Sequence, residues 1–274
     1  MSIRIISLDE IFGGYKRLIK SLSDLYDKDP LPPHCYLVYD LFHEIDNTDL
    51  VLKLSGGEIV SYVLVWRSPR VYGVHIWRFD KDLLSKIYFP PDRRAFVHVY
   101  DEDEKIISLI EERLREIGFS NIERREYYDM TCGEKDFSPS NNESITVRLG
   151  VEHVDVFIDL MRSMGREIDY EEAFEILRKR RYYGVIIDDK LVSIASRYLT
   201  LDKIHMIGDV YTRPEYRGRG YARAVTSAIT REAVSTGALA ALHVETSNEP
   251  ALRVYKRIGY KIVRRNYWLI AYPQ

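Results

Sequence analysis

Apolar and polar residues alternate along this chain in two periods, one typical of helices and one typical of strands. Apolar residues recur every three to four positions in several segments, which predicts amphipathic helices. These helices are expected at 8–26, 34–44, 104–117, 151–164, 170–180, 218–235 and 249–258. Short apolar runs bounded by Gly, Pro, Asn or Asp predict strands. The strands are expected at 50–54, 59–66, 71–79, 95–100, 122–130, 145–148, 183–188, 191–199, 204–212, 240–246 and 261–271.

The two halves of the chain share part of this pattern. The first half contains Phe96-Val97-His98-Val99, then a predicted helix, then Gly118-Phe119 and a strand. The second half contains Ala241-Leu242-His243-Val244, then a predicted helix, then Gly259-Tyr260 and a strand. Residues recur as well as pattern, which favours a duplication over chance similarity. The polar segment 133–143 is the expected linker, so the predicted domains are 1–135 and 143–274.

Composition and charge narrow the class of protein. The chain has 274 residues and a formal net charge of −2, which disfavours a broadly basic surface for nucleic acid. Its two cysteines have no CxxC spacing, so we expect neither a disulfide framework nor a metal site. No apolar run reaches the length of roughly 18 residues that a membrane span requires. We therefore expect a cytoplasmic protein without a membrane partner.

The segment 209–222 (DVYTRPEYRGRGYA) carries the clearest chemistry. It places a predicted strand, a turn at Pro214 and then the start of a helix in succession. The N-terminus of a helix has unpaired backbone N–H groups and partial positive charge. Gly218 and Gly220 let an anion approach this backbone closely, and the neighbouring arginines add charge. The segment therefore predicts a site for a pyrophosphate.

Two motifs in the second half of the chain resemble those of a known superfamily. Arg217-x-x-Gly220-x-Ala222, after Val210-Tyr211-Thr212-x-Pro214, resembles the acetyl-CoA loop of the GNAT superfamily of N-acetyltransferases. Downstream, Asn248-x-x-Ala251-x-x-x-Tyr255-x-x-x-Gly259-Tyr260 resembles the second signature of that superfamily. The resemblance covers about residues 145–271. The loop differs from a dinucleotide site, which has Gly-x-Gly-x-x-Gly after a first strand.

The resemblance implies a role for each matching residue. The strand before the loop would separate from its neighbour and pair with the pantetheine arm of CoA through Val210, Tyr211 and Thr212. Asn248 would contact the same arm. The backbone N–H groups expected to hold the pyrophosphate belong to Arg217, Gly218, Arg219, Gly220, Tyr221 and Ala222.

The resemblance also implies a general acid. Tyr255 matches that position, and a phenol with a pKa near 10 can protonate a departing thiolate. No motif identifies the base that deprotonates the amine. Glu245 is the first candidate and Asp209 the second, because both stand at strand ends close to the expected thioester. His205 and His243 lie further back, and we interpret them as packed or hydrogen-bonded residues.

The first half has the expected shape of the superfamily without its site. The segment between Phe79 and Phe96 has no glycine and no Arg-x-x-Gly-x-Ala. Leu114 stands four residues before Gly118, where Tyr255 stands before Gly259. We hypothesise a degenerate domain that binds no CoA and forms a wall of the acceptor site. Such a tandem arrangement is similar to the glycine N-acyltransferase group.

These observations predict an α+β fold: a mixed, mostly antiparallel sheet with helices on both faces, present in two copies. The expected function is transfer of an acetyl group from acetyl-CoA to a primary amine by direct attack, with no metal. Small amines, amino acids, peptides and proteins all stay open as acceptors. One alternative is a non-catalytic module that binds acetyl-CoA as a sensor or scaffold. Another is aminoacyl transfer from charged tRNA, which the acidic net charge disfavours.

Overall fold

A computed structural model describes residues 3–7, 16–86 and 88–273 of the chain. The described residues form two compact units. Unit 1 comprises Met1–Tyr128 and Arg264–Gln274, and unit 2 comprises Asp129–Val263. The last strand, β12 (Lys261–Tyr272), therefore belongs mainly to unit 1. In this respect the units differ from the domains 1–135 and 143–274 expected from the sequence.

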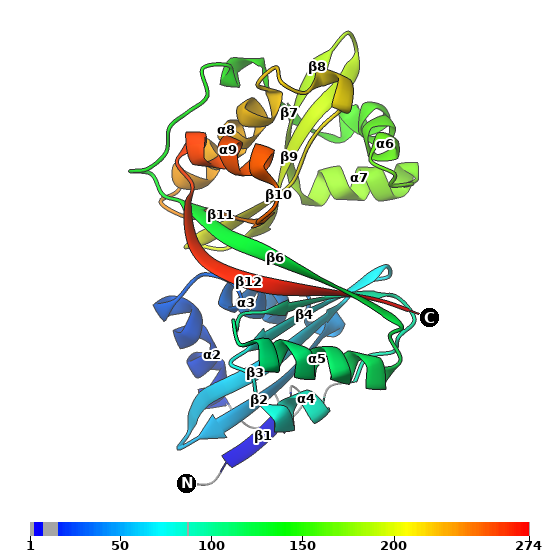
Figure 1. The fold of residues 1–274 in the computed structure, drawn as a ribbon. Helices are drawn as coiled ribbons and strands as arrows, with labels where there is room; N and C mark the ends of the chain where they lie inside the picture. Colours follow the sequence, from blue (N-terminus) through cyan, green and yellow to red (C-terminus); the bar gives the residue numbers. More distant parts are fainter. Residues whose placement is uncertain (1–2, 8–15, 87, 274) are drawn as a thin grey trace. The chain divides into compact units, whose positions relative to one another are not determined.

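Unit 1 is built on a sheet with the order β1-β2-β3-β4-β5-β12 (Figure 1). In the order of the sequence, its first five strands are β1 (Ile3–Ser7), β2 (Thr48–Ser55), β3 (Glu58–Arg67), β4 (Val71–Trp77) and β5 (Arg94–Val99). Most neighbours are antiparallel, and β4 and β5 are parallel. The strand β12 pairs with β5 from Tyr267 opposite Val99 to Ala271 opposite Ala95.

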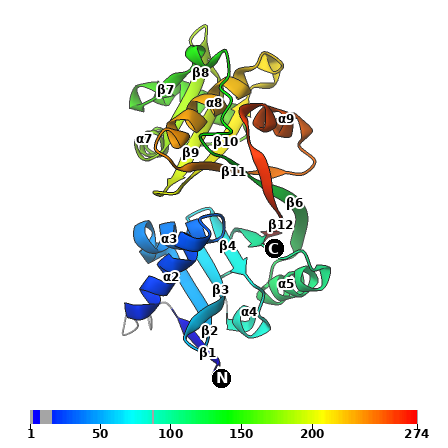
Figure 2. The same cartoon turned by 90° about the vertical axis from the view of Figure 1, so that its left-hand side faces the viewer.

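Helices pack on both faces of the unit 1 sheet, as the alternation of side chains along β3 requires. Tyr62 and Leu64 face the apolar cluster beneath α2 (Lys16–Lys28) and α3 (His34–His43). Val63 and Val65 face the other cluster, beneath α4 (Lys81–Lys86) and α5 (Glu104–Ile117). Figure 2 shows these two pairs of helices on opposite sides of the strands.

Unit 2 repeats this arrangement. Its sheet runs from the end of β6 (Asn121–Cys132) through β11, β10, β9 and β8 to β7. The strands are β7 (Val147–Leu149), β8 (Arg181–Ile187), β9 (Lys190–Thr200), β10 (Ile204–Thr212) and β11 (Leu239–Glu245). An apolar cluster that includes Phe157 and Leu177 joins α6 (Val154–Ser163) and α7 (Tyr170–Lys179) to one face. The other face carries α8 (Tyr221–Val234) and α9 (Glu249–Ile258) (Figure 1).

Local sequence explains where the main elements begin and end. Asp103 caps α5 by accepting from the Lys105 N–H, and Gly118 ends it in the left-handed conformation. Asp188 and Asp189 both adopt positive φ and close the hairpin between β8 and β9. The expected helices and strands are found with shifts of a few residues at their ends.

Some features of the described residues differ from the expected elements or add to them. Strand β1 and the short helix α4 were not predicted, because five or six residues carry too little periodicity to be recognised. The helix expected at 8–26 is seen as α2 from Lys16 onward, and 8–15 lie outside the described residues. Cys35 and Cys132 are both free and buried. No helix among the described residues is long and apolar enough to cross a membrane.

Candidate active site

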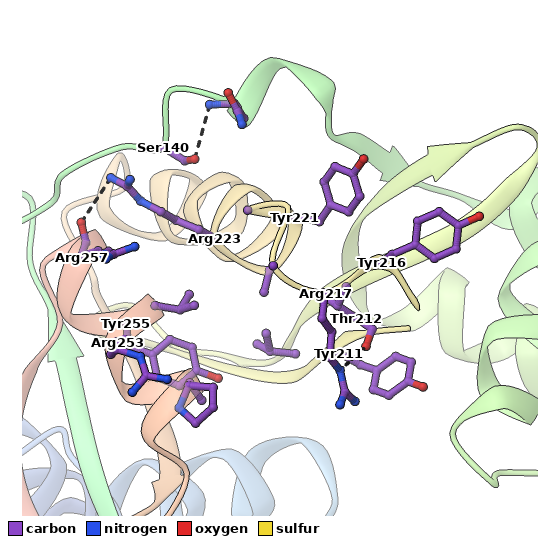
Figure 3. A pocket seen from close by; sticks show the side chains of 18 of the residues that line it. Ser140, Tyr211, Thr212, Tyr216, Arg217, Tyr221, Arg223, Arg253, Tyr255 and Arg257 are labelled. Atoms are coloured by element: carbon purple, nitrogen blue, oxygen red, sulfur yellow. Dashed lines mark hydrogen bonds between the residues drawn. The ribbon is translucent and has the colours of Figure 1, made fainter. Parts of the chain in front are cut away.

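A cavity of about 780 Å³ opens in unit 2 between β10, the start of α8 and α9 (Figure 3). Its described lining includes four arginines, Arg217, Arg223, Arg253 and Arg257, and no acidic residue. Arg253 pairs with Glu249 outside the lining at 3.1 Å, and for Arg217, Arg223 and Arg257 no acidic partner is found among the described residues. An excess of cations along a concave surface favours an anionic ligand. The ten predicted site residues that line the cavity are Val210, Tyr211, Thr212, Arg217, Gly218, Gly220, Tyr221, Ala222, Asn248 and Tyr255.

The strand β10 separates from β11 at this cavity. The two strands pair in parallel only from Ile204 to Met206, and β10 continues unpaired on this side to Thr212. A bulge between Gly208 and Tyr211 in the pairing with β9 adds a bend, and Asp209 within it has φ of +47°. The unpaired edge of 210–212 therefore lies open at the cavity wall. Separation of these strands was expected from the resemblance.

The N-terminus of α8 provides a cluster of backbone donors. Gly218 and Gly220 have φ of +77° and +83°, and Gly220 is the N-cap without a side-chain cap. Within the described residues, the backbone N–H groups of 218–223 donate to no protein acceptor. A Cβ added at Gly218 would meet nothing within 4 Å, so the space above the loop is open. These features fit an anion held by backbone amides at a helix start.

Arginine side chains are fixed around this loop. Arg217 Nε donates to the Thr212 carbonyl oxygen at 3.1 Å, which closes the turn between β10 and α8. Arg223 Nη2 lies 3.4 Å from the Pro139 carbonyl and 3.5 Å from the Arg257 carbonyl. Arg219 lies over the Tyr216 ring instead, and it does not belong to the described cavity lining.

Tyr255 lies on α9, across the cavity from Tyr211 on β10 (Figure 3). The side chain is only 6% exposed, and burial raises its pKa to about 12. The phenol is therefore protonated at neutral pH, as a proton donor must be. Asn248 caps α9 by accepting from the Ala251 N–H at 3.2 Å. Gly259 ends the helix with φ of +107°, and a Cβ there would lie 1.9 Å from the Asp136 carbonyl oxygen.

Tyr255 lines the cavity, but the two candidate bases do not. Neither Glu245 nor Asp209 belongs to the described cavity lining. Asp209 accepts hydrogen bonds from Tyr182, Ser196 and Arg166. Burial tends to raise the pKa of Asp209, but the Tyr182 hydrogen bond and the charges of Arg166 and Arg180 outweigh it and lower this pKa. A carboxyl with a lowered pKa is a weak base, which counts against this role.

The two histidines have ordinary partners. His243 Nδ1 lies 2.7 Å from Asp129 Oδ1, and both side chains are buried. His205 is buried beside Arg197 at 3.4 Å, and burial followed by that charge lowers its pKa to about 4. His205 is thus neutral at pH 7.

Part of the cavity wall comes from the segment expected to be only a linker. Ser140, Asn141 and Asn142 line the cavity. The Ser140 N–H donates to Ser227 on α8, whose hydroxyl donates to Glu143 at 2.6 Å. The polar, turn-rich composition of 133–143 predicts an irregular segment but gives no sign of this docking. Arg223 also lines the cavity, and it is one of the arginines expected to add charge beside the loop. The other unpredicted lining residues are Tyr216, Pro250, Ala251, Arg253, Val254 and Arg257.

Among its described residues, unit 1 does not show the corresponding features. Its parallel strands β4 and β5 pair from Val71 opposite Arg94 to Ile76 opposite Val99, so they do not separate. Leu83, Leu84 and Phe89 between these strands are buried in the core. The position that corresponds to Tyr255 holds the buried Leu114. These features favour the hypothesis that unit 1 binds no CoA.

Comparisons with known proteins agree with the duplicated fold. Residues 182–269 match the model of the FR47-like protein family. No curated protein matches the sequence. A Drosophila protein of known structure is 17% identical, with 99% of this chain and 98% of that chain covered and a TM-score of 0.65.

Two further solved structures are similar over nearly the whole chain. A GCN5-related N-acetyltransferase from Sphaerobacter thermophilus is 16% identical, with 97% and 95% covered and a TM-score of 0.60. A tandem GNAT protein from the clavulanic acid biosynthesis pathway is 15% identical, with 98% of both chains covered and a TM-score of 0.57. The chain is therefore a tandem GNAT-fold protein whose second half carries an FR47-like sequence.

Proposed function

We propose that unit 2 binds acetyl-CoA and transfers its acetyl group to a primary amine. One observation carries the proposal: a single cavity joins the open edge of β10, the free amides of α8 and the buried phenol of Tyr255. The amides of 218–222 and the nearby arginines would hold the pyrophosphate, whereas the Arg217 N–H, expected to take part, donates to the Pro214 carbonyl oxygen at 3.2 Å. Residues 210–212 and Asn248 would hold the pantetheine arm.

The reaction needs one bond to form and one to break. The amine nitrogen attacks the thioester carbonyl, the new C–N bond forms, and the C–S bond breaks. Tyr255 would give its proton to the departing sulfur, and the amine would lose one proton to a base or to water. Because Asp209 has a lowered pKa, Glu245 or a water chain is the better proposal for this step.

The first experiment measures CoA binding by calorimetry and free-thiol release from acetyl-CoA against pooled amino acids, polyamines and short peptides. Thiol release in one pool, reduced in Tyr255→Phe with CoA binding retained, is the expected result. Absence of CoA binding would overturn the proposal at its first step.

A non-catalytic acetyl-CoA sensor is the second candidate function. It is favoured by one observation, namely that neither candidate base belongs to the described cavity lining. Tight CoA binding without thiol release in any pool is the result that this alternative predicts.

A further inference from the structure

The residues of the basic run Arg178–Arg181 have different acidic partners. Arg178 and Lys179 pair with Glu175 one turn earlier on α7, at 2.7 and 3.1 Å. Arg180, the C-cap of α7, instead extends toward β10, where its Nη1 lies 3.7 Å from Asp209 Oδ2. A second arginine, Arg166, follows the end of α6 and donates to Asp209 Oδ1 at 3.1 Å. Two arginines from different segments thus converge on one carboxylate.

This carboxylate has more donors than it needs. Tyr182 and Ser196 donate to Oδ2 at 2.7 and 3.1 Å, in addition to the hydrogen bond from Arg166. Arg180 is beyond hydrogen-bond distance of it. A buried carboxylate requires one counter-charge, and here two positive charges surround one negative charge. The net charge of +1 leaves capacity for a second anion.

The two arginine side chains are partly exposed. The Arg166 side chain is 53% exposed and that of Arg180 is 45% exposed. Each guanidinium has five N–H donors. Arg166 donates to Asp209 and Arg180 hydrogen-bonds the Tyr182 hydroxyl, so these contacts use only a part of the donors. A planar carboxylate matches this arrangement better than a phosphate dianion, because the net charge is one and guanidinium forks bind carboxylates in pairs.

The cluster also lies beside the proposed reaction site. Asp209 directly precedes Val210, which lines the cavity. The Tyr211 hydroxyl donates to the Ser163 carbonyl at 3.4 Å, which joins the cavity wall to the segment that carries Arg166. The φ of Asp209 is +47°, a strained conformation that is often retained at functional sites.

We propose that Arg166 and Arg180 bind a carboxylate of the acceptor, so that the acceptor is an amine bearing a carboxylate, such as a free amino acid. This inference rests on the proposed acetyl transfer and adds the substrate class to it. Asp209 is then a positioning residue that holds both guanidinium groups, which agrees with its low basicity.

The test uses amino acids and their decarboxylated analogues as matched probes: glycine and methylamine, phenylalanine and phenethylamine, lysine and cadaverine. Thiol release gives KM and kcat for each. Saturation-transfer NMR measures binding of the same probes to the protein–CoA complex without turnover. The variants are Arg166→Met and Arg180→Met. The control is Arg178→Met, which removes the same charge from a residue paired only along its own helix.

We expect at least one amino acid to have a KM about tenfold or more below that of its analogue, since a charge-assisted pair is lost in the analogue. Both variants should raise the amino-acid KM by about tenfold, leave the KM of the analogue unchanged, and leave CoA affinity unchanged. The control should change none of these. If Arg180→Met does not fold, Arg180→Lys keeps the charge near Asp209 but loses the paired donors, and should also raise this KM.

Equal KM values for both members of every pair would overturn the inference while the proposed acetyl transfer stands. So would an amino-acid preference that survives in both arginine variants. If no probe releases thiol, the acetyl transfer fails for these acceptors, and NMR then decides the inference by itself. Amino-acid binding that is lost in Arg180→Met supports it, and absence of amino-acid binding overturns it.

Discussion

Among single side chains, Tyr255 allows the sharpest test of chemistry. Tyr255→Phe removes one oxygen atom from a side chain that is 6% exposed, so packing should be retained. We expect kcat to fall by about 10²-fold or more, with CoA affinity unchanged, because only proton donation is lost. Steady-state thiol release together with calorimetry measures both quantities.

The pH dependence provides an independent check on the same residue. Burial raises the pKa of Tyr255 to about 12, so its phenol keeps its proton through pH 10. The wild-type rate should therefore show no alkaline decrease from Tyr255 between pH 8 and 10. A decrease centred below pH 10 that disappears in Tyr255→Phe would contradict this environment.

His205 should make unit 2 sensitive to acid. Its pKa is about 4 in the folded state and about 6.5 in an unfolded chain, so between these values only the unfolded state binds the proton. The free energy of unfolding should thus decrease as pH falls from 6.5 toward 4, by about 1–3 kcal/mol from this group. The difference between the melting temperatures at pH 7.5 and pH 5 should be smaller in His205→Gln than in the wild type. The exposed His43→Gln should behave as wild type.

Sequence motifs were informative about the residues that touch the cavity and less so about those that do not. The positive φ of Gly218 and Gly220 follows from the steric freedom of glycine, which the sequence reveals directly. The state of Asp209 depends on Tyr182 and Arg166, which are 27 and 43 positions away in the chain. Such long-range electrostatics could not be derived from local pattern, and a strand-end carboxylate therefore appeared suitable as a base.

At the scale of elements, the turn from β10 into α8 can be tested with matched glycines. Gly220→Ala introduces strain at φ of +83° and places a methyl group in the loop. Gly237→Ala, just beyond the end of α8, introduces the same strain at φ of +84°, with nothing within 4 Å of the new atom. Both should lose about 1–2 kcal/mol of stability, but only Gly220→Ala should weaken CoA binding, by about tenfold. Equal affinity in both variants would argue against the loop as the pyrophosphate site.

Helices and strands were predicted well where periodicity is long, as in α5, β10 and α9, whose bounds agree with expectation. The segment 133–143 shows the limit of this approach. Its docking on α8 depends on Ser227 and Glu143, whose sequence separation is 84. Polarity alone indicates an irregular segment, and only the fold reveals that this segment forms a wall of the cavity.

At the scale of the whole chain, the main difference from the predicted domains is that the last strand, β12, joins the sheet of unit 1. The pattern of 261–271 predicts a strand but not its partner, because alternation is the same in either sheet. In the structure, Leu269 and Ala271 are fully buried in the core of unit 1. We therefore expect Leu269→Ala to destabilise unit 1 by about 2–5 kcal/mol. Ile262→Ala, at a position 43% exposed in unit 2, should change stability by less than about 0.5 kcal/mol.

The position of β12 also leads to a prediction for fragments of the chain. A fragment of residues 1–132 contains β1–β5 and β6 but lacks β12, the strand that pairs with β5, so the edge of β5 and the apolar side chains that Leu269 covers would be exposed. We expect this fragment to give the collapsed NMR spectrum of an unfolded chain, and a synthetic peptide of residues 264–273 to restore dispersed signals. Cooperative thermal unfolding of the fragment by itself would contradict this expectation. If the peptide restores these signals, the first half of the chain depends on residues 264–273 for its fold, and a cut at the linker that the sequence indicates would separate unit 1 from its own last strand.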